Sequence, residues 1–181
     1  MLVLIGPSAS GKTEIAKKLM CKYNIKKVVT YTTRKKRENE IDKIDYNFIS
    51  ESSFKQLEKE NFFVETTFYN NNYYGTAKKD ISDDKCIVVD PNGFKSFLKL
   101  HDSHIISFFL ECSKQTRKER MILRKDKMEN ILTRLGNDEI AFDKNKIEGI
   151  TYYINSEKES VEVLADKIYS LYIKAIKLWK H

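Results

Sequence analysis

Short apolar runs separated by amphipathic segments dominate the chain. Continuous apolar residues predict strands, which lie at Leu2–Ile5, 28–31, 86–89, 105–110 and 152–154. Apolar positions that recur every three or four residues predict helices, which lie at 11–22, from about 92, within 114–137 and at the C-terminal end. Apolar strands that alternate with helices are typical of a mostly parallel sheet covered on both faces. The expected fold class is therefore α/β.

A second pattern interrupts this alternation between residues 46 and 79. Short runs of β-branched and aromatic residues predict strands at 46–49, 62–68 and 73–77, around a helix near 52–59. A strongly polar stretch precedes them. We expect this segment to form a small antiparallel subdomain inserted into the main sheet.

The last helix carries the clearest amphipathic stripe. Ser156 with Glu159 three residues later has the pattern of a capping box, which predicts the helix start. The apolar stripe consists of Val161, Leu164, Ile168, Leu171, Ala175 and Leu178. Such a stripe is compatible with a coiled coil, but a terminal helix that packs on the sheet is the commoner structure.

Composition restricts the class of protein. With 181 residues, 41% of them apolar, the chain is long enough for one folded domain and too apolar to be disordered. No apolar run approaches a membrane span and no secretory pattern is evident, so we expect no membrane association and no secretion. Three scattered cysteines, without the spacing of metal ligands, predict free thiols in a reducing cytoplasm.

An eight-residue motif directly after the first strand gives the strongest chemical signal. Its pattern, G-x4-G-K-[ST], lets successive backbone N–H groups face one phosphate at the positive end of a helix. Lys12 would reach the β- and γ-phosphates of ATP, and the Thr13 hydroxyl would coordinate Mg²⁺. The expected ATP-binding residues of this phosphate loop are Gly6, Pro7, Ser8, Ala9, Ser10, Gly11, Lys12 and Thr13. The flanking strand and helix predict a P-loop NTPase-type core.

A basic tract at 34–37 needs its neighbours for an interpretation. Alone it fits a solvated charge run, a localisation signal or a nucleic-acid patch. The net charge of +7 suggests anionic ligands in general and does not decide among these alternatives. It lies within T-T-R-x-x-R-x-x-E-x5-Y, and Glu65 follows, nine positions before Tyr74 in N-Y-Y-G-T. Together with the loop GPSASGKT, these motifs resemble the guanylate kinase family over almost the whole chain.

The resemblance implies an acceptor site for GMP. Arg34 and Arg37 would grip its monophosphate, because guanidinium forks match phosphate oxygens. An ionised Glu65 would accept hydrogen bonds from the two adjacent donors of guanine, whereas adenine presents an acceptor there. Glu40 would orient the arginines. The implied GMP-binding residues are Thr30, Arg34, Arg37, Glu40, Tyr46, Glu65, Tyr74, Gly75, Thr76 and Asp90.

The resemblance also implies a subdivision of the single domain. The core would comprise 1–31, 80–112 and 150–181, with an acceptor-binding β subdomain near 32–79 and a helical lid near 113–149. Asn155 would lie near the adenine of ATP. Arg117 and Lys118 fit a solvated helix face instead. The implied catalytic residues, including the lid arginines, are Lys12, Arg34, Arg37, Arg120, Arg124 and Arg134.

We therefore expect ATP-dependent phosphorylation of GMP or dGMP, with Mg²⁺ and without nucleic-acid or membrane partners. One departure is Val88, which stands where the family usually has the first aspartate of D-x-D-x-x-G. It leaves a kinase for another small phosphorylated acceptor as an alternative. A catalytically inactive binding domain is a second alternative, although its phosphate loop would be expected to be spoiled. A nucleic-acid-binding P-loop protein is a third, and the oligomeric state stays open.

Overall fold

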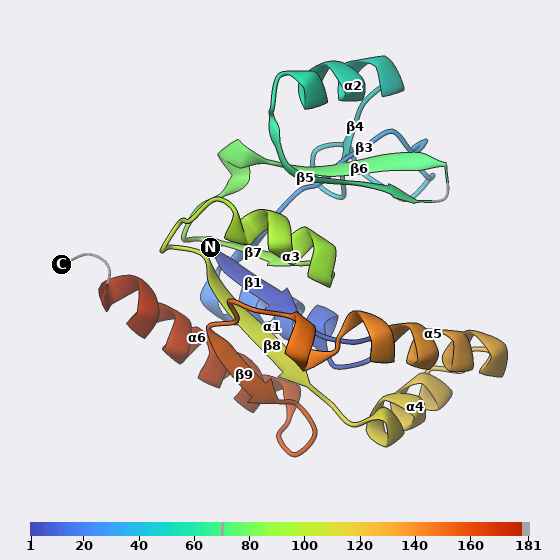
Figure 1. Cartoon of the computed structure of the whole chain (residues 1–181), viewed down its shortest axis with the longest axis vertical. Coiled ribbons are helices and arrows are strands. Elements are labelled where there is room, and N and C mark those ends of the chain that lie inside the picture. Colours follow the sequence, from blue (N-terminus) through green and yellow to red (C-terminus); the bar gives the residue numbers. More distant parts are fainter. Residues whose placement is uncertain (70, 179–181) are drawn as a thin grey trace.

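The main sheet has five parallel strands in the order β2-β7-β1-β8-β9 (Figure 1). The computed structural model describes residues 1–69 and 71–178. The strands are β1 (Leu2–Ile5), β2 (Lys26–Lys27), β7 (Lys85–Val88), β8 (Ile106–Glu111) and β9 (Tyr152–Asn155). β1 is the central strand of this order, so the loop that follows β1 lies at the middle of the carboxyl edge of the sheet.

Helices cover both faces of this sheet, as its apolar strands require. Leu2 and Leu4 face a core formed with α1 (Lys12–Tyr23) and α6 (Val161–Leu178). Val3 and Ile5 face a second core formed with α3 (Pro91–Leu98). This alternation follows from the two-residue period of a strand. The predicted α/β class is confirmed.

A second sheet of four strands lies apart from the first, at the top of Figure 1. Its order is β4-β3-β6-β5, and α2 (Glu51–Lys59) packs on it through Phe54. Its strands are β3 (Tyr31–Thr32), β4 (Asn47–Phe48), β5 (Phe63–Tyr69) and β6 (Asn72–Ala77). The pairs β3–β6 and β5–β6 are antiparallel, as expected, but β3–β4 is parallel.

The strand predicted at 28–31 is wrong as a single element. The chain instead contributes β2 to the parallel sheet and β3 to the small sheet, and the buried Val28 lies between them. A continuous apolar run could not reveal this division, because it results from the transfer of the chain from one sheet to the other.

Two helices, α4 (Lys114–Leu123) and α5 (Met128–Ala141), lie beside one another at the carboxyl edge of the main sheet (Figure 1). Ser113 caps α4 by accepting the Thr116 N–H at 3.2 Å. Met121 of α4 packs with Ile131 and Leu135 of α5 in a small separate core. Two short 3₁₀ turns also occur within the chain, η1 (Lys78–Asp80) before β7 and η2 (Lys144–Lys146) before β9.

The predicted capping box at Ser156 is also wrong. Helix α6 begins at Val161, and the Ser160 hydroxyl accepts the Val163 N–H at 3.3 Å. Ser156 is buried and prolongs β9, since its N–H and its hydroxyl both donate to the Glu111 carbonyl at 2.9 Å. The middle of the stripe on α6 packs in the core shared with α1 and the main sheet, whereas Val161 and Leu178 at its two ends are exposed. Within the part of the chain described, no helix combines the length and apolarity of a membrane span.

Candidate active site

The phosphate loop connects β1 to α1 through backbone conformations that most residues avoid. Gly6 and Gly11 have φ of 148° and 98°, and Ala9 has φ of 61°. A Cβ atom on Gly6 would lie 2.7 Å from the Leu110 carbonyl oxygen of β8. The loop therefore passes against β8 so closely that only glycine fits at its first position.

Lys12, the first residue of α1, is folded back onto its own loop. Its ammonium donates to the carbonyls of Gly6 at 2.5 Å and Pro7 at 2.8 Å. Burial lowers the pKa of Lys12 to about 8, partly opposed by the nearby Asp138 carboxylate. The ammonium is thus mostly charged at neutral pH, and a bound phosphate would raise the pKa of Lys12 and favour the charged form further.

A pocket of about 400 Å³ opens beside the loop and is lined by residues 9–15, Arg120, Arg124 and the segment that enters α6. Arg120 is anchored in it: its guanidinium donates to the carbonyls of Ala9 at 3.2 Å and Ser156 at 2.6 Å. We call this the donor pocket. It brings together the phosphate loop and two of the three predicted lid arginines.

The third predicted lid arginine takes a different position. Arg134 lies 3.6 Å from Asp126, whose carboxylate also accepts from Arg124 at 2.8 Å. The described lining of the donor pocket does not include Arg134. Both arginine side chains are 54% exposed, so both are free to change rotamer.

The predicted acceptor arginines converge on Glu40. The Arg34 guanidinium donates to one carboxylate oxygen at 2.6 Å, and the main-chain N–H of Arg37 donates to the other at 2.8 Å. The bond between Arg34 and Glu40 raises the pKa of Arg34 and lowers that of Glu40. The Arg34 guanidinium also lies 5.4 Å from the centre of the Tyr46 ring. Glu40 and Tyr46 thus fix Arg34 from two sides.

A second pocket, of about 190 Å³, lies between the two sheets. Glu65 of β5 accepts a hydrogen bond from the Thr76 hydroxyl of β6 at 2.7 Å. Burial raises the pKa of Glu65, and the Asp90 carboxylate adds to this shift. We call this the acceptor pocket; its lining includes Thr30, Glu65, Thr67, Tyr74, Thr76, Val88 and Asp90.

Three predicted residues of this region have further structural roles. Asp90 caps α3, because its carboxylate accepts the Gly93 N–H at 2.7 Å. Tyr74 lines the acceptor pocket and packs edge-on against Tyr46, with ring centres 6.2 Å apart. Gly75 is outside the described lining; its Cα faces Phe63 and Phe54, where a Cβ would be 2.9 and 3.1 Å from ring carbons.

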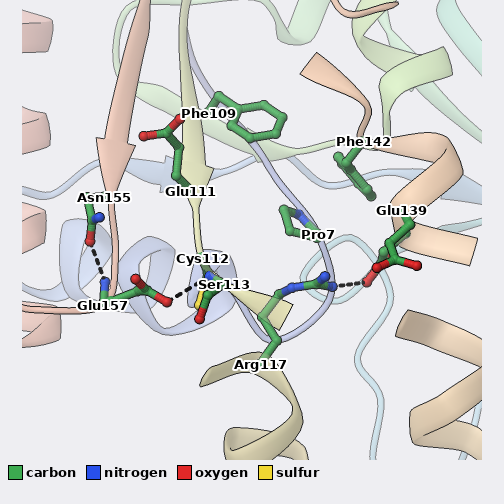
Figure 2. Close-up of a pocket in the computed structure, with 11 residues that line it drawn as sticks. Pro7, Phe109, Glu111, Cys112, Ser113, Arg117, Glu139, Phe142, Asn155 and Glu157 are labelled. Atoms are coloured by element: carbon green, nitrogen blue, oxygen red, sulfur yellow. Dashed lines mark hydrogen bonds and ion pairs between the residues drawn. The ribbon is translucent and has the colours of Figure 1, made fainter. Parts of the chain in front are cut away.

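Asn155 lies in a third pocket rather than in the donor pocket. Figure 2 shows it at the end of β9, where its side-chain oxygen accepts the Glu157 N–H at 3.0 Å. Pro7 and Phe142 line the same pocket from the opposite side. Pro7 belongs to the phosphate loop, so this pocket borders that loop, and the placement of Asn155 near the adenine of ATP stays a prediction.

Sequence reasoning missed a buried ion pair beside the phosphate loop. Arg117, expected on a solvated face, is only 6% exposed and donates to Asp138 at 2.8 Å. Asp138 also accepts the Ser8 N–H at 2.8 Å. A signal was present: Asp138 follows Leu135 by three residues, and Arg117 precedes Met121 by four, which places each polar residue on a buried helix face.

The donor pocket is suited to Mg²⁺ at Thr13. Its lining includes the hydroxyl residues Ser10, Thr13 and Ser156, and the Ser10 hydroxyl is buried without a hydrogen-bond partner among the described residues. Mg²⁺ prefers hard oxygen ligands and usually takes only one or two from the protein, the rest coming from water and substrate phosphates. The described residues contain no group of three His, Cys, Asp or Glu that could hold a metal alone.

Comparisons with known proteins agree with this geometry. The family model described as "Guanylate kinase" matches residues 1–167. The guanylate kinase of Helicobacter pylori (strain ATCC 700392 / 26695) is 38% identical over 148 residues, which cover 76% of this chain and 70% of the relative. That of Anaplasma phagocytophilum (strain HZ) is 32% identical over 178 residues, which cover 93% of this chain and 83% of the relative.

Solved structures give the same result. The crystal structure of guanylate kinase from Anaplasma phagocytophilum superposes with a TM-score of 0.63 at 28% identity, covering 94% of this chain and 82% of that one. Shikimate kinase from Acinetobacter baumannii, at 14% identity and a TM-score of 0.53, shares the fold over 96% of this chain and 92% of its own. This chain is therefore a nucleoside monophosphate kinase, a phosphotransferase, and it belongs to the guanylate kinase family.

Proposed function

We propose that this enzyme transfers the γ-phosphate of ATP to GMP or dGMP, forming ADP and GDP or dGDP. The observation that carries the proposal is the position of Glu65 in the acceptor pocket. Tyr74 links this pocket to the Arg34–Glu40 pair, since its ring contacts Tyr46 and its hydroxyl, after Glu40, raises the pKa of Arg34. One end of the acceptor region thus presents the Arg34 cation, which would meet the phosphate of a nucleoside monophosphate. The other end presents the buried Glu65 carboxylate, which would meet hydrogen-bond donors of its base.

Glu65 favours guanine over the other bases for a chemical reason. An ionised carboxylate only accepts hydrogen bonds, and guanine offers two adjacent donors, N1–H and the exocyclic amine. Adenine would place the lone pair of N1 against the carboxylate. Sites built to pair a substrate's polar group reject analogues that lack it by about 10⁴-fold or more. The hydroxyls of Thr30 and Thr76 in the same pocket would contact the base.

The transfer itself needs alignment and charge neutralisation more than proton transfer, because the attacking phosphate oxygen is already an anion. Lys12 and the N–H groups at the start of α1 would hold the β- and γ-phosphates. Mg²⁺, held at Thr13 when bound, supplies further positive charge to these oxygens. Arg34, Arg37, Tyr46 and Tyr74 would hold the acceptor phosphate in line.

The lid arginines would complete the charge neutralisation. Arg120 already contacts the phosphate loop, whereas Arg124 and Arg134 share Asp126 outside the loop. Closure of the lid would exchange this carboxylate for phosphate oxygens and exclude water that would otherwise hydrolyse ATP. The free cysteines of the described chain and the need for ATP support a cytoplasmic place in purine nucleotide metabolism.

A coupled assay of ADP release tests the proposal directly. We expect turnover with GMP and dGMP and, at equal concentration, rates with AMP, CMP and UMP lower by about 10³-fold or more. Equal rates with AMP and GMP would contradict the assignment of the acceptor. Turnover with none of the five nucleotides would contradict the proposed activity.

Substitution of Glu65 tests the base-reading assignment. In Glu65→Gln the side-chain amide turns a donor toward guanine, so we expect kcat/KM for GMP to fall by about 10²-fold or more while KM for ATP stays unchanged. The matched control is Glu60→Gln, the same change at an exposed position at the end of α2. Unchanged discrimination between GMP and AMP in Glu65→Gln would show that another group reads the base.

A further inference from the structure

A buried carboxylate from α5 is bound to the phosphate loop. Asp138 accepts the Ser8 N–H at 2.8 Å and the Ser8 hydroxyl at 3.3 Å. Its third hydrogen bond comes from the guanidinium of Arg117 on α4, at 2.8 Å. Figure 2 shows the Arg117 side chain extending from α4 toward the loop that carries Pro7. One carboxylate thereby joins the phosphate loop to both helices that follow β8.

This contact is well protected from solvent. The side chains of Arg117 and Asp138 are 6% and 10% exposed. A carboxylate is stable in such surroundings only with several hydrogen bonds and an opposite charge, and Asp138 has both. Removal of either partner would leave a buried charge without compensation, so the two helices and the loop are held as one unit.

The ammonium of Lys12 is bonded to the same part of the loop. It donates to the carbonyl of Pro7, the residue before Ser8, at 2.8 Å. The ring of Phe142, which follows α5, lies 5.9 Å from the ammonium. The hydrogen bonds of Asp138 to Ser8 therefore hold the stretch of loop on which Lys12 itself is folded.

We propose that Asp138 is a positioning residue of the phosphate site, which holds the Ser8 end of the loop and the Lys12 ammonium ready for the ATP phosphates. Arg117 keeps the Asp138 carboxylate in place. The proposal rests on the proposed use of ATP by this loop. It concerns the donor side alone, so changes at Asp138 leave the acceptor pocket intact.

The alternative is an ion pair that only stabilises the packing of α4 on α5. The two ideas differ in what they predict for substrate binding. Loss of a pair that only supports packing would lower the free energy of unfolding and affect both nucleotides alike. Loss of a carboxylate that holds Ser8 would weaken ATP binding and leave GMP binding as in the wild type.

Kinetics give the first test. In Asp138→Asn, which keeps an acceptor for Ser8, we expect kcat/KM for ATP to fall by about tenfold, and in Asp138→Ala by about 10²-fold. KM for GMP should stay within about twofold of the wild-type value in both variants. The control is Glu139→Gln, an exposed neighbour that pairs with Lys114 at 2.8 Å and should behave as wild type. A parallel loss for GMP and ATP, or an equal loss in Glu139→Gln, would overturn the proposal.

ATP affinity gives the second test, measured by calorimetry without any acceptor. We expect Kd for ATP to rise by about tenfold in Asp138→Asn and by about 10²-fold in Asp138→Ala, whereas Glu139→Gln should match the wild type. An unchanged ATP affinity in Asp138→Ala would overturn the proposal.

Two further points keep these tests independent. Urea unfolding of each variant identifies any that does not fold, and if Asp138→Ala is one of them, the ATP affinity of Asp138→Asn decides. The calorimetric result does not depend on the acceptor. A wild-type protein that binds ATP but fails to phosphorylate GMP would contradict the proposed function and leave the Asp138 test standing.

Discussion

The two substrate sides of this enzyme are built in opposite ways. The phosphate loop takes its groups from consecutive residues between β1 and α1, and much of its binding capacity lies in the backbone. The acceptor pocket gathers Thr30, Glu65 and Asp90 from three separate elements that meet between the two sheets. The donor side therefore depends on local conformation, whereas the acceptor side depends on the packing of side chains from distant parts of the chain.

Removal of the Lys12 charge should have the largest effect and should fall on the donor side alone. Lys12→Met keeps much of the side-chain volume but removes the ammonium that would neutralise the transferring phosphoryl group. Loss of one such preorganised charge or donor reduces kcat by about 10²- to 10³-fold. Steady-state kinetics with saturating GMP measure this loss, and calorimetry with GMP alone should give an affinity equal to that of wild type.

The control for this change is Lys17→Met, on the exposed face of the same helix, where the structure pairs Lys17 with Glu14. We expect its kinetics to match the wild type. If GMP affinity falls together with kcat in Lys12→Met, the two sides are more strongly coupled than their separate construction suggests.

Two glycine substitutions compare the backbone of the loop with the packing of the small sheet. Gly6→Ala combines an unfavourable φ of 148° with a backbone oxygen 2.7 Å from the new Cβ, and we expect destabilisation of about 3 kcal/mol or more and no ATP binding. Gly75→Ala meets the rings of Phe63 and Phe54, which can move slightly, and should cost about 1–3 kcal/mol.

Urea unfolding and calorimetry with each nucleotide check both expectations. Gly75→Ala should weaken GMP binding more than ATP binding, because the displaced rings lie under β6 and its neighbours in the acceptor region. Equal destabilisation by the two substitutions would show that Phe54 and Phe63 are as rigid as the main chain of β8.

The same contrast explains what the sequence could predict. Four strands of the main sheet, β1, β7, β8 and β9, and the phosphate loop follow from consecutive residues, and the structure contains them close to the expected bounds. The division of 28–31 between two sheets, and the parallel pairing of β3 with β4, depend on where distant segments lie. No local pattern contains that information.

Serine and charged residues show the limit most clearly. Ser156 and Ser160 both have the chemistry of a helix cap, and the choice of Ser160 follows from the bonds of Ser156 to Glu111 on β8. Arg117 lies in a basic stretch that is otherwise typical of a solvated face, and only the arrival of Asp138 from α5 makes its burial possible. In both cases a tertiary contact selects between local alternatives.

The smallest expected effect is a difference in pH dependence between the two sides. Burial raises the pKa of Glu65, and guanine binds its ionised form, so GMP binding releases a proton when the pH lies below that pKa. GMP affinity should therefore fall as the pH decreases. Burial lowers the pKa of Lys12 to about 8, and ATP binds its charged form, so ATP binding takes up a proton above that pH. ATP affinity should therefore fall as the pH increases.

We call the fall in GMP affinity at low pH the acid limb and the fall in ATP affinity at high pH the alkaline limb. Each limb approaches a tenfold change in affinity per pH unit for one linked proton, and the changes near neutral pH are smaller. Calorimetry with each nucleotide alone, in buffers of different ionisation enthalpy, measures both the affinity and the number of protons exchanged. Glu65→Gln should abolish the acid limb for GMP and leave the alkaline limb for ATP in place, whereas Lys12→Met should do the reverse. An acid limb for GMP that persists in Glu65→Gln would show that a group other than Glu65 takes up the proton.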